Sequence, residues 1–210
     1  MSTDNAVIGQ LSKRPLYTVI NKKDFLGSLD TNPYYFRHYD LSHFTLFYNG
    51  KPIHSEGLPM NMDHEKTSVL AYNTLFEGLD IRHSNAGLQL THDMLIAGYC
   101  MLMFDVTTNR ATSEGHISLP VQCNIRLELR FDKPLPDAVM CLLYLEYDNS
   151  LRIDQLRSVS ADFLDNGRGS DSMHSEGRDF VPGRLSVRHS TAAFCNSSGD
   201  SYLKFGTAHV

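Results

Sequence analysis

The sequence lacks a long apolar run, and it also lacks an apolar leader at its start. The longest apolar run, Ala138 to Leu145, has eight residues, whereas a transmembrane helix needs about 20. The first ten residues are polar or small, without the basic and apolar regions of a secretory signal. We therefore expect an intracellular protein that is neither secreted nor inserted in a membrane.

The sequence also has no cluster of basic residues. Its 19 Lys and Arg residues against 24 Asp and Glu residues give a formal net charge of −5, and nucleic-acid binding by charge requires clustered cations. With 41% hydrophobic and 20% charged residues, the composition is that of an ordinary globular chain. We expect a domain with its own core and no direct binding of nucleic acid.

Signatures of common enzymes and metal proteins are missing as well. The sequence contains no G-x-S-x-G, Walker, H-E-x-x-H or G-x-G-x-x-G motif. No C-x-x-C pair is present, which argues against a zinc ribbon or a dithiol redox site. We predict no cofactor and no enzymatic activity, and we expect four reduced, mostly buried cysteines: Cys100, Cys123, Cys141 and Cys195.

Alternation of polar and apolar residues predicts an antiparallel sheet. Every second residue between Asn124 and Asp132 is apolar, so one face of this strand should be buried. The next run, Ala138 to Tyr147, is apolar at nearly every position and predicts a strand covered on both faces. Leu41 to Tyr48 predicts a third strand, which Asn49-Gly50 should turn into a hairpin. The buried residues expected in the alternating strand are Ile125, Leu127, Leu129 and Phe131.

Helical patterns are few. Thr67 to Phe76 predicts one helix, and a second, short helix should start at a Thr91 cap and end at Gly98. Pro15 to Ile20 and Tyr99 to Val106 are further strand candidates. Short strands separated by turns predict a mainly β fold, an antiparallel β-sandwich or jelly roll with one or two short helices.

The composition changes after about residue 160. The last 50 residues contain 6 Gly and 8 Ser, and the regular alternation is lost. We predict a domain over residues 1–160 and a Gly/Ser-rich, flexible and disordered tail over residues 161–210.

His38 and Asp40 are the best candidates for metal ligands. Two residues apart on a strand, they would share one face and could reach a single ion. Iron oxygenases on jelly-roll scaffolds use such a pair with a distant third histidine, for which His116 is available, and Arg126 could then anchor a substrate carboxylate. Because H-x-D is a short motif, the favoured interpretation is ordinary polar residues near the start of a strand.

A series of short segments runs in order through about residues 2–160. They are Gly9 to Arg14, Phe25 to Ser28, Asn32 to Leu41, Tyr72 to Gly78, Ala97 to Tyr99, Phe104 to Thr107, Gly115-His116, Arg126 to Phe131, Pro134 to Pro136, Tyr144 to Asn149 and Ile153-Asp154. In order and spacing, this series resembles the jelly-roll capsid-like proteins encoded by Maverick/Polinton-type elements and related adintoviruses.

The resemblance implies a capsid subunit of double jelly-roll type that assembles as trimers and has no catalytic residues. The matching stretch corresponds to the C-terminal jelly roll of longer family members, which implies a truncated or domesticated remnant. Expected partners are copies of the chain itself and longer capsid-like homologues, within a virion if a capsid role is retained. The alternative is the iron-dependent oxygenase; a lectin-like module has only the aromatic Tyr34 and Tyr35 in its favour.

Overall fold

The computed structural model describes residues 2–60, 62, 68–82, 84–107, 110, 112, 121–153, 158–162, 185–196 and 201–204 of the 210-residue chain. These residues form eleven strands and three helices. The strands are β1 Ser2–Gln10, β2 Arg14–Asn21, β3 Leu41–Tyr48, β4 Lys51–Pro52, β5 Leu58–Pro59, β6 Met101–Met103, β7 Gln122–Phe131, β8 Val139–Ile153, β9 Val159–Asp162, β10 Leu185–Asn196 and β11 Ser201–Lys204; the helices are α1 Lys22–Leu26, α2 Ser68–Gly78 and α3 His92–Ala97.

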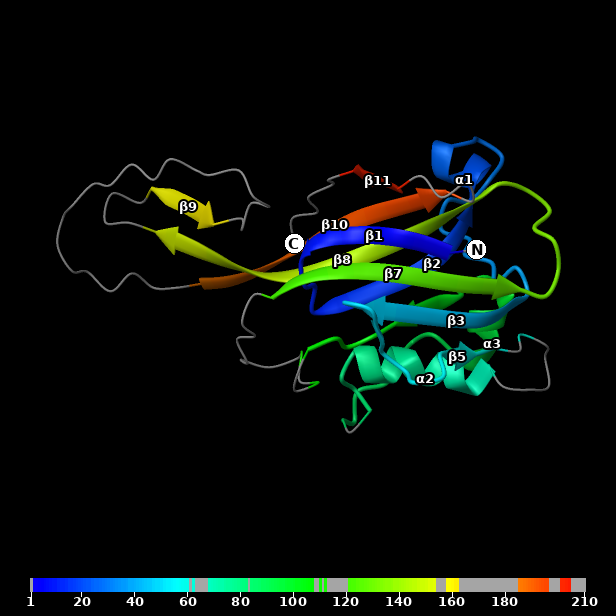
Figure 1. The fold of residues 1–210 in the computed structure, drawn as a ribbon, viewed down its shortest axis with the longest axis horizontal. Coiled ribbons are helices and arrows are strands. Elements are labelled where there is room, and N and C mark those ends of the chain that lie inside the picture. The colour runs from blue at the N-terminus through cyan, green and yellow to red at the C-terminus, as the bar shows by residue number, and fades with distance from the viewer. Residues whose placement is uncertain are drawn as a thin grey trace.

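The strands form two antiparallel sheets that pack as a sandwich (Figure 1). Sheet A has the order β1-β7-β3-β4, with β5 also paired to β3; sheet B has the order β11-β10-β8-β2-β6, with β9 also paired to β8. The chain crosses from sheet A to sheet B three times, between β1 and β2, between β5 and β6, and between β7 and β8. The predicted fold class, a mainly β antiparallel sandwich, is confirmed.

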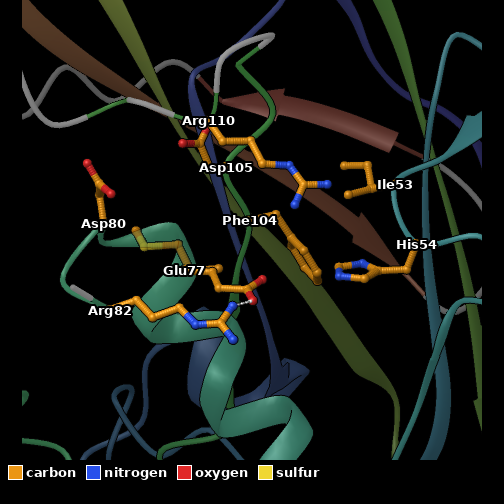
Figure 2. A pocket seen from close by; sticks show the side chains of 9 residues that line it. Ile53, His54, Glu77, Asp80, Arg82, Phe104, Asp105 and Arg110 are labelled. Atoms are coloured by element: carbon orange, nitrogen blue, oxygen red, sulfur yellow. Dashed lines mark hydrogen bonds and ion pairs between the residues drawn. The ribbon is translucent and has the colours of Figure 1, made fainter.

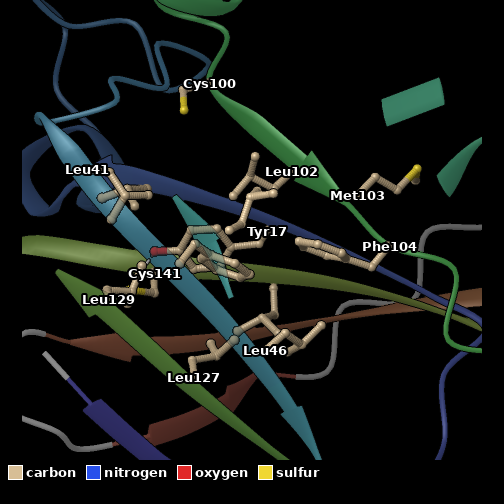
Figure 3. Close-up of a cluster of buried hydrophobic side chains, with 14 of the residues drawn as sticks. Tyr17, Leu41, Leu46, Cys100, Leu102, Met103, Phe104, Leu127, Leu129 and Cys141 are labelled. Atoms are coloured by element: carbon tan, nitrogen blue, oxygen red, sulfur yellow. Dashed lines mark hydrogen bonds between the residues drawn. The ribbon is translucent and has the colours of Figure 1, made fainter. Parts of the chain in front are cut away.

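The core between the sheets explains the alternation in β7. Its inward residues Ile125, Leu127 and Leu129 are at most 3% exposed, while the intervening residues remain partly accessible. Aromatic side chains from other strands fill the centre, among them Tyr17 (Figure 3). The Tyr17 ring lies 4.7 Å from that of Phe44, centroid to centroid. The predicted buried face of this strand is confirmed, with Phe131 half-buried at its end.

Strand β8 differs from its prediction, because only one of its faces is fully covered. Cys141, Leu143 and Leu145 face the core and are at most 1% exposed. On the opposite face Leu142 is partly exposed and Tyr144 is 39% exposed. The nearly continuous apolar run therefore leaves apolar side chains at the outer surface of sheet B.

The hairpin turn and the helix cap that the sequence predicts both form. Asn49 and Gly50 have φ of 45° and 77°, and they join β3 to β4 in a hairpin. Helix α3 begins after Thr91, whose Oγ1 accepts a hydrogen bond from the Met94 N–H at 3.3 Å, and it ends at Gly98. Three helices form where one or two were predicted, and no helix in the described ranges has the length and apolar character to cross a membrane.

Part of the stretch predicted to be a flexible tail belongs to sheet B. Within residues 161–210 the structure describes 161–162, 185–196 and 201–204, and all of these lie in strands. Strand β10 pairs with β8 along its whole length, from Leu185 opposite Leu151 to Asn196 opposite Met140. Backbone pairing with a preceding strand organises this segment, and such long-range pairing leaves little mark on a Gly/Ser-rich composition. The remaining tail lies outside the described residues.

Candidate functional site

His38 and Asp40 lie in a tight turn that leads into β3. Tyr39 and Asp40 both have φ of 50°, which is not a strand conformation. The Asp40 N–H donates a hydrogen bond to His38 Nδ1 at 3.0 Å, and the Asp40 carboxylate lies 2.9 Å from Lys133 Nζ. The expectation that these two residues lie on a strand is therefore wrong. Within the turn, His38 Nδ1 lies 3.7 Å from an Asp40 carboxylate oxygen, and that carboxylate also pairs with Lys133.

The remaining residues of the predicted iron site do not gather at this turn. His116 lies outside the described residues. Arg126 is five residues along β7 from Phe131, the strand partner of Leu41 beside the turn, which separates Arg126 from the turn by about 17 Å. Among the residues that the structure describes, no group of three or more His, Cys, Asp or Glu side chains could hold a metal ion.

The Arg126 guanidinium is held on the outer face of sheet A by side chains of its own chain. It forms an ion pair with Glu128 and lies 3.7 Å from an Asp4 carboxylate oxygen. Its Cζ is 4.3 Å from the centroid of the Phe47 ring. These contacts link side chains of β1, β7 and β3 at the surface, and they occupy the guanidinium that was expected to bind a substrate carboxylate.

A pocket of about 220 Å³ opens between the end of α2, the β4–β5 connection and the segment after β6 (Figure 2). Glu77 and Arg82 form an ion pair at its wall. The Asp105 carboxylate accepts hydrogen bonds from the N–H and hydroxyl of Thr107 and from the Thr112 hydroxyl. The lining residues are Ile53, His54, Glu77, Asp80, Arg82, Met103, Phe104, Asp105 and Arg110.

The pocket lies where separate segments of the chain pack together. Its described lining contains no Ser, Thr, Cys or Lys that could act as a nucleophile beside His54. The His54 ring instead packs edge-on against Phe104, with centroids 5.9 Å apart. The sequence analysis missed this pocket because its walls come from three separate segments, and no local motif predicts that they meet.

Burial disfavours ionisation of two core thiols and of one phenol. Burial raises the pKa of the Cys100 thiol to about 12 and that of Cys123 to about 11, whereas a nucleophilic cysteine needs a lowered pKa. Burial also raises the pKa of Tyr147 to about 12. Among the described residues, Cys100, Cys123 and Cys141 are buried and form no disulfide, which confirms the prediction for these three.

The aromatic residues that favoured a lectin-like module are accessible. Tyr34 is 72% exposed and Tyr35 is 37% exposed. The Tyr35 ring, however, lies against Gly98 and carries the Arg37 guanidinium 4.9 Å above its centroid. One of the two rings is therefore a packing element of the loop before β3.

The outer faces of the two sheets differ in chemistry. On sheet A, the outward residues of β7 are all polar. On sheet B, two neighbouring rows run across β6, β2 and β8, and they combine Met101, Thr18 and Leu142 in one row with Met103, Leu16 and Tyr144 in the next. We call the partly exposed members of these rows the outer patch: Leu16, Met101, Leu142 and Tyr144.

Strand β8 continues beyond the sandwich as an arm (Figure 1). Strand β2 accompanies β8 only from Val139 to Glu146, and farther along β8 pairs with β9 on one side and β10 on the other. We define the arm as residues 148–153 of β8, 159–162 of β9 and 185–188 of β10. Figure 1 shows the arm reaching past the end of sheet A, so the described strands of sheet A do not extend over it.

In the arm, directly opposite residues of the paired strands are alike in character. One set of alternating register positions is polar in sequence, and the other set is apolar except for Asn149. The polar set is Asp148, Ser150, Arg152, Ser160, Asp162, Ser186 and Arg188; the apolar set includes Leu151, Ile153, Val159, Ala161, Leu185 and Val187.

Comparison with known proteins adds one relative. The chain is 26% identical over 159 residues to the uncharacterized protein F54H12.2 of Caenorhabditis elegans, and the match covers 74% of this chain and 37% of the worm protein. The chain thus spans little more than a third of the length of that relative. No protein-family model and no solved structure matches it.

Proposed function

We propose that this chain is a non-enzymatic structural protein, similar to the jelly-roll capsid subunits of Maverick/Polinton-type elements, and that it acts by self-association. The arm carries the proposal. Alternation of polar and apolar residues along paired strands is typical of a sheet that packs one face against another layer, and the described part of sheet A ends before the arm begins. An element of this kind suits a subunit that packs against its own copies.

Two further observations support the proposal. An antiparallel β-sandwich is the fold that the capsid resemblance implies. The worm protein is much longer than the matched region, in keeping with a chain that corresponds to one part of a longer subunit. We accordingly propose trimers as the assembled form, longer capsid-like homologues as further partners, and an intracellular location, in a virion where a capsid role is retained.

The iron-dependent oxygenase lacks comparable support. His38 and Asp40 bind each other within a turn, and Arg126 is engaged by Glu128 and Asp4 far along β7. No observation in the described residues favours this alternative over self-association.

Sedimentation velocity of the purified chain tests the proposal. Between about 1 μM and about 1 mM, the range of moderate to weak affinities, the weight-average mass should rise from that of the 23.7 kDa monomer. A chain that remains monomeric throughout this range, alone and with a longer homologue, would contradict it.

A further inference from the structure

The pocket between α2, the β4–β5 connection and the segment after β6 contains a guanidinium that is not paired. On one wall, the Glu77 carboxylate forms an ion pair with the Arg82 guanidinium. Arg110 lies on another wall, and its guanidinium forms no ion pair or hydrogen bond with any side chain that the structure describes. Its planar set of N–H donors is therefore available to a bound anion.

Hydrogen bonds on both sides of Arg110 hold its backbone in an unusual conformation. Arg110 has φ of 51°, in the left-handed region that is uncommon for residues other than Gly. Its N–H donates to the Thr107 carbonyl at 3.2 Å. The Asp105 carboxylate accepts hydrogen bonds from Thr107 and from Thr112, which precede and follow Arg110 in sequence. Residues held in this region by their surroundings cluster at ligand-binding sites.

Apolar side chains lie beside this guanidinium in the pocket. Figure 2 shows the Arg110 side chain reaching over the pocket, with its guanidinium on the side of Ile53 and Phe104. Met103 also lines the pocket. A ligand that suits these walls carries an anionic group for Arg110 and an apolar body for the three other side chains.

We propose that this pocket binds a small organic acid with one carboxylate and an apolar body. The carboxylate accepts two parallel hydrogen bonds from the Arg110 guanidinium, and the body contacts Ile53 and Phe104. The volume of about 220 Å³ equals that of about seven water molecules at about 30 Å³ each, which limits the ligand to a small molecule. This inference goes beyond the proposed self-association and does not depend on it.

The charges of the pocket favour a singly charged acid over a dianion such as a phosphate ester. Glu77 compensates the charge of Arg82, and two further carboxylates, Asp80 and Asp105, line the pocket. Among the described lining residues, Arg110 is thus the one guanidinium left to balance a ligand. A second negative charge on the ligand would lie near carboxylates without a counter-charge, which is unfavourable.

Three probes that share a benzene ring test the proposal: benzoate, the neutral benzamide, and phenyl phosphate. Titration of the ¹⁵N-labelled full chain, followed by NMR, measures each dissociation constant and shows whether the amides of Ile53 and His54 are perturbed. We expect benzoate to saturate the pocket with a dissociation constant on the order of 1 mM. Benzamide should bind at least about tenfold more weakly, and so should phenyl phosphate at about pH 7.5, where it carries nearly two charges.

Substitutions of Arg110 assign the binding to its guanidinium. Arg110→Gln removes the charge and should raise the dissociation constant of benzoate by about tenfold or more. Arg110→Lys keeps the charge but not the planar fork, so its dissociation constant should lie between those of wild type and Arg110→Gln. Arg130→Gln is the matched control, because Arg130 is exposed on β7 and does not line the pocket, and it should leave the dissociation constant within about twofold of wild type. Circular dichroism confirms that each variant is folded, and Arg110→Lys carries the comparison if Arg110→Gln is unfolded.

The outcomes that overturn the inference are distinct from those that test self-association. Benzoate that does not saturate wild type, or that binds Arg110→Gln as tightly as wild type, shows that Arg110 holds no carboxylate. Equal affinities for benzamide and benzoate show that the pocket does not recognise the charge, and tighter binding of phenyl phosphate assigns it to dianions; either result contradicts the proposal. A chain that is monomeric at every concentration but binds benzoate through Arg110 refutes the proposed function and leaves this inference standing.

Discussion

Among single residues, Gly98 shows most clearly how a local conformation fixes a tertiary contact. Its φ is 138°, and a Cβ at this position would lie 2.1 Å from the Cε2 atom of Tyr35. Its carbonyl accepts a hydrogen bond from the Phe36 N–H at 2.8 Å. Gly98 therefore ends α3 and at the same time lets the loop before β3 approach the start of β6.

We predict that Gly98→Ala destabilises the protein more than Gly27→Ala does. Gly27 also has a positive φ, of 87°, but no atom lies within 4 Å of the position of its Cβ. Gly27→Ala should cost about 1–2 kcal/mol from backbone conformation alone, and Gly98→Ala should cost at least about 1 kcal/mol more because the Tyr35 ring must move.

Urea unfolding of both variants measures the difference, and the Tyr35→Ala background identifies its origin. Removing the ring should bring the two costs together. Equal costs in the wild-type background would show that the ring moves away freely.

At the scale of elements, short helices of this chain depend on their ends. Helix α3 has six residues, and only Leu95 and Ile96 are buried. Its first turn is closed by the Thr91 side chain and contains Asp93, whose charge suits the positive end of the helix dipole. A helix this short has little intrinsic stability, so its cap contributes a large share.

We predict that Thr91→Ala lowers the free energy of unfolding by about 1 kcal/mol, within the range of about 0.5–2 kcal/mol for a lost N-cap. Thr91→Ser retains the capping oxygen and should lose less than half as much. Urea unfolding again provides the measurement. A Thr91→Ser variant as unstable as Thr91→Ala would assign the effect to the lost methyl group and not to the hydrogen bond to Met94.

At the scale of the whole molecule, burial ties folding to the protonation of core thiols. Cys100 is 6% exposed and Cys123 is 5% exposed, and burial raises the pKa of both thiols, as it does for Tyr147. Each group holds its proton more tightly in the folded state than in the unfolded chain. Their contribution to stability is complete below the unfolded pKa and is lost as pH rises toward the folded value.

We predict that the free energy of unfolding falls as pH rises from about 9 toward about 12, the interval between the unfolded and folded pKa of Cys100. One such group contributes up to about 1.4 kcal/mol per pH unit. Cys100→Ala should therefore show a shallower decline, measured by urea unfolding across this interval. Identical slopes for wild type and variant would mean that the Cys100 thiol ionises equally in both states.

Local patterns in the sequence determined the fold class and several details of it. Period-two alternation in β7, the Asn49-Gly50 turn and the Thr91 cap each act over a few neighbouring residues. Such patterns involve only neighbouring residues, so they can be recognised in the sequence. The folded protein keeps these local structures because the tertiary packing buries the same apolar residues.

Only the tertiary structure decided which strands pair and which side chains meet. The sequence pattern predicted that His38 and Asp40 lie on a strand. In the structure they lie in a turn, where Tyr39 and Asp40 have positive φ and Asp40 pairs with Lys133. It left residues 185–196 in a tail, although pairing with β8 makes them part of sheet B. Such contacts join residues far apart along the chain, and their free energy depends on long-range register and layer order, which no short segment encodes.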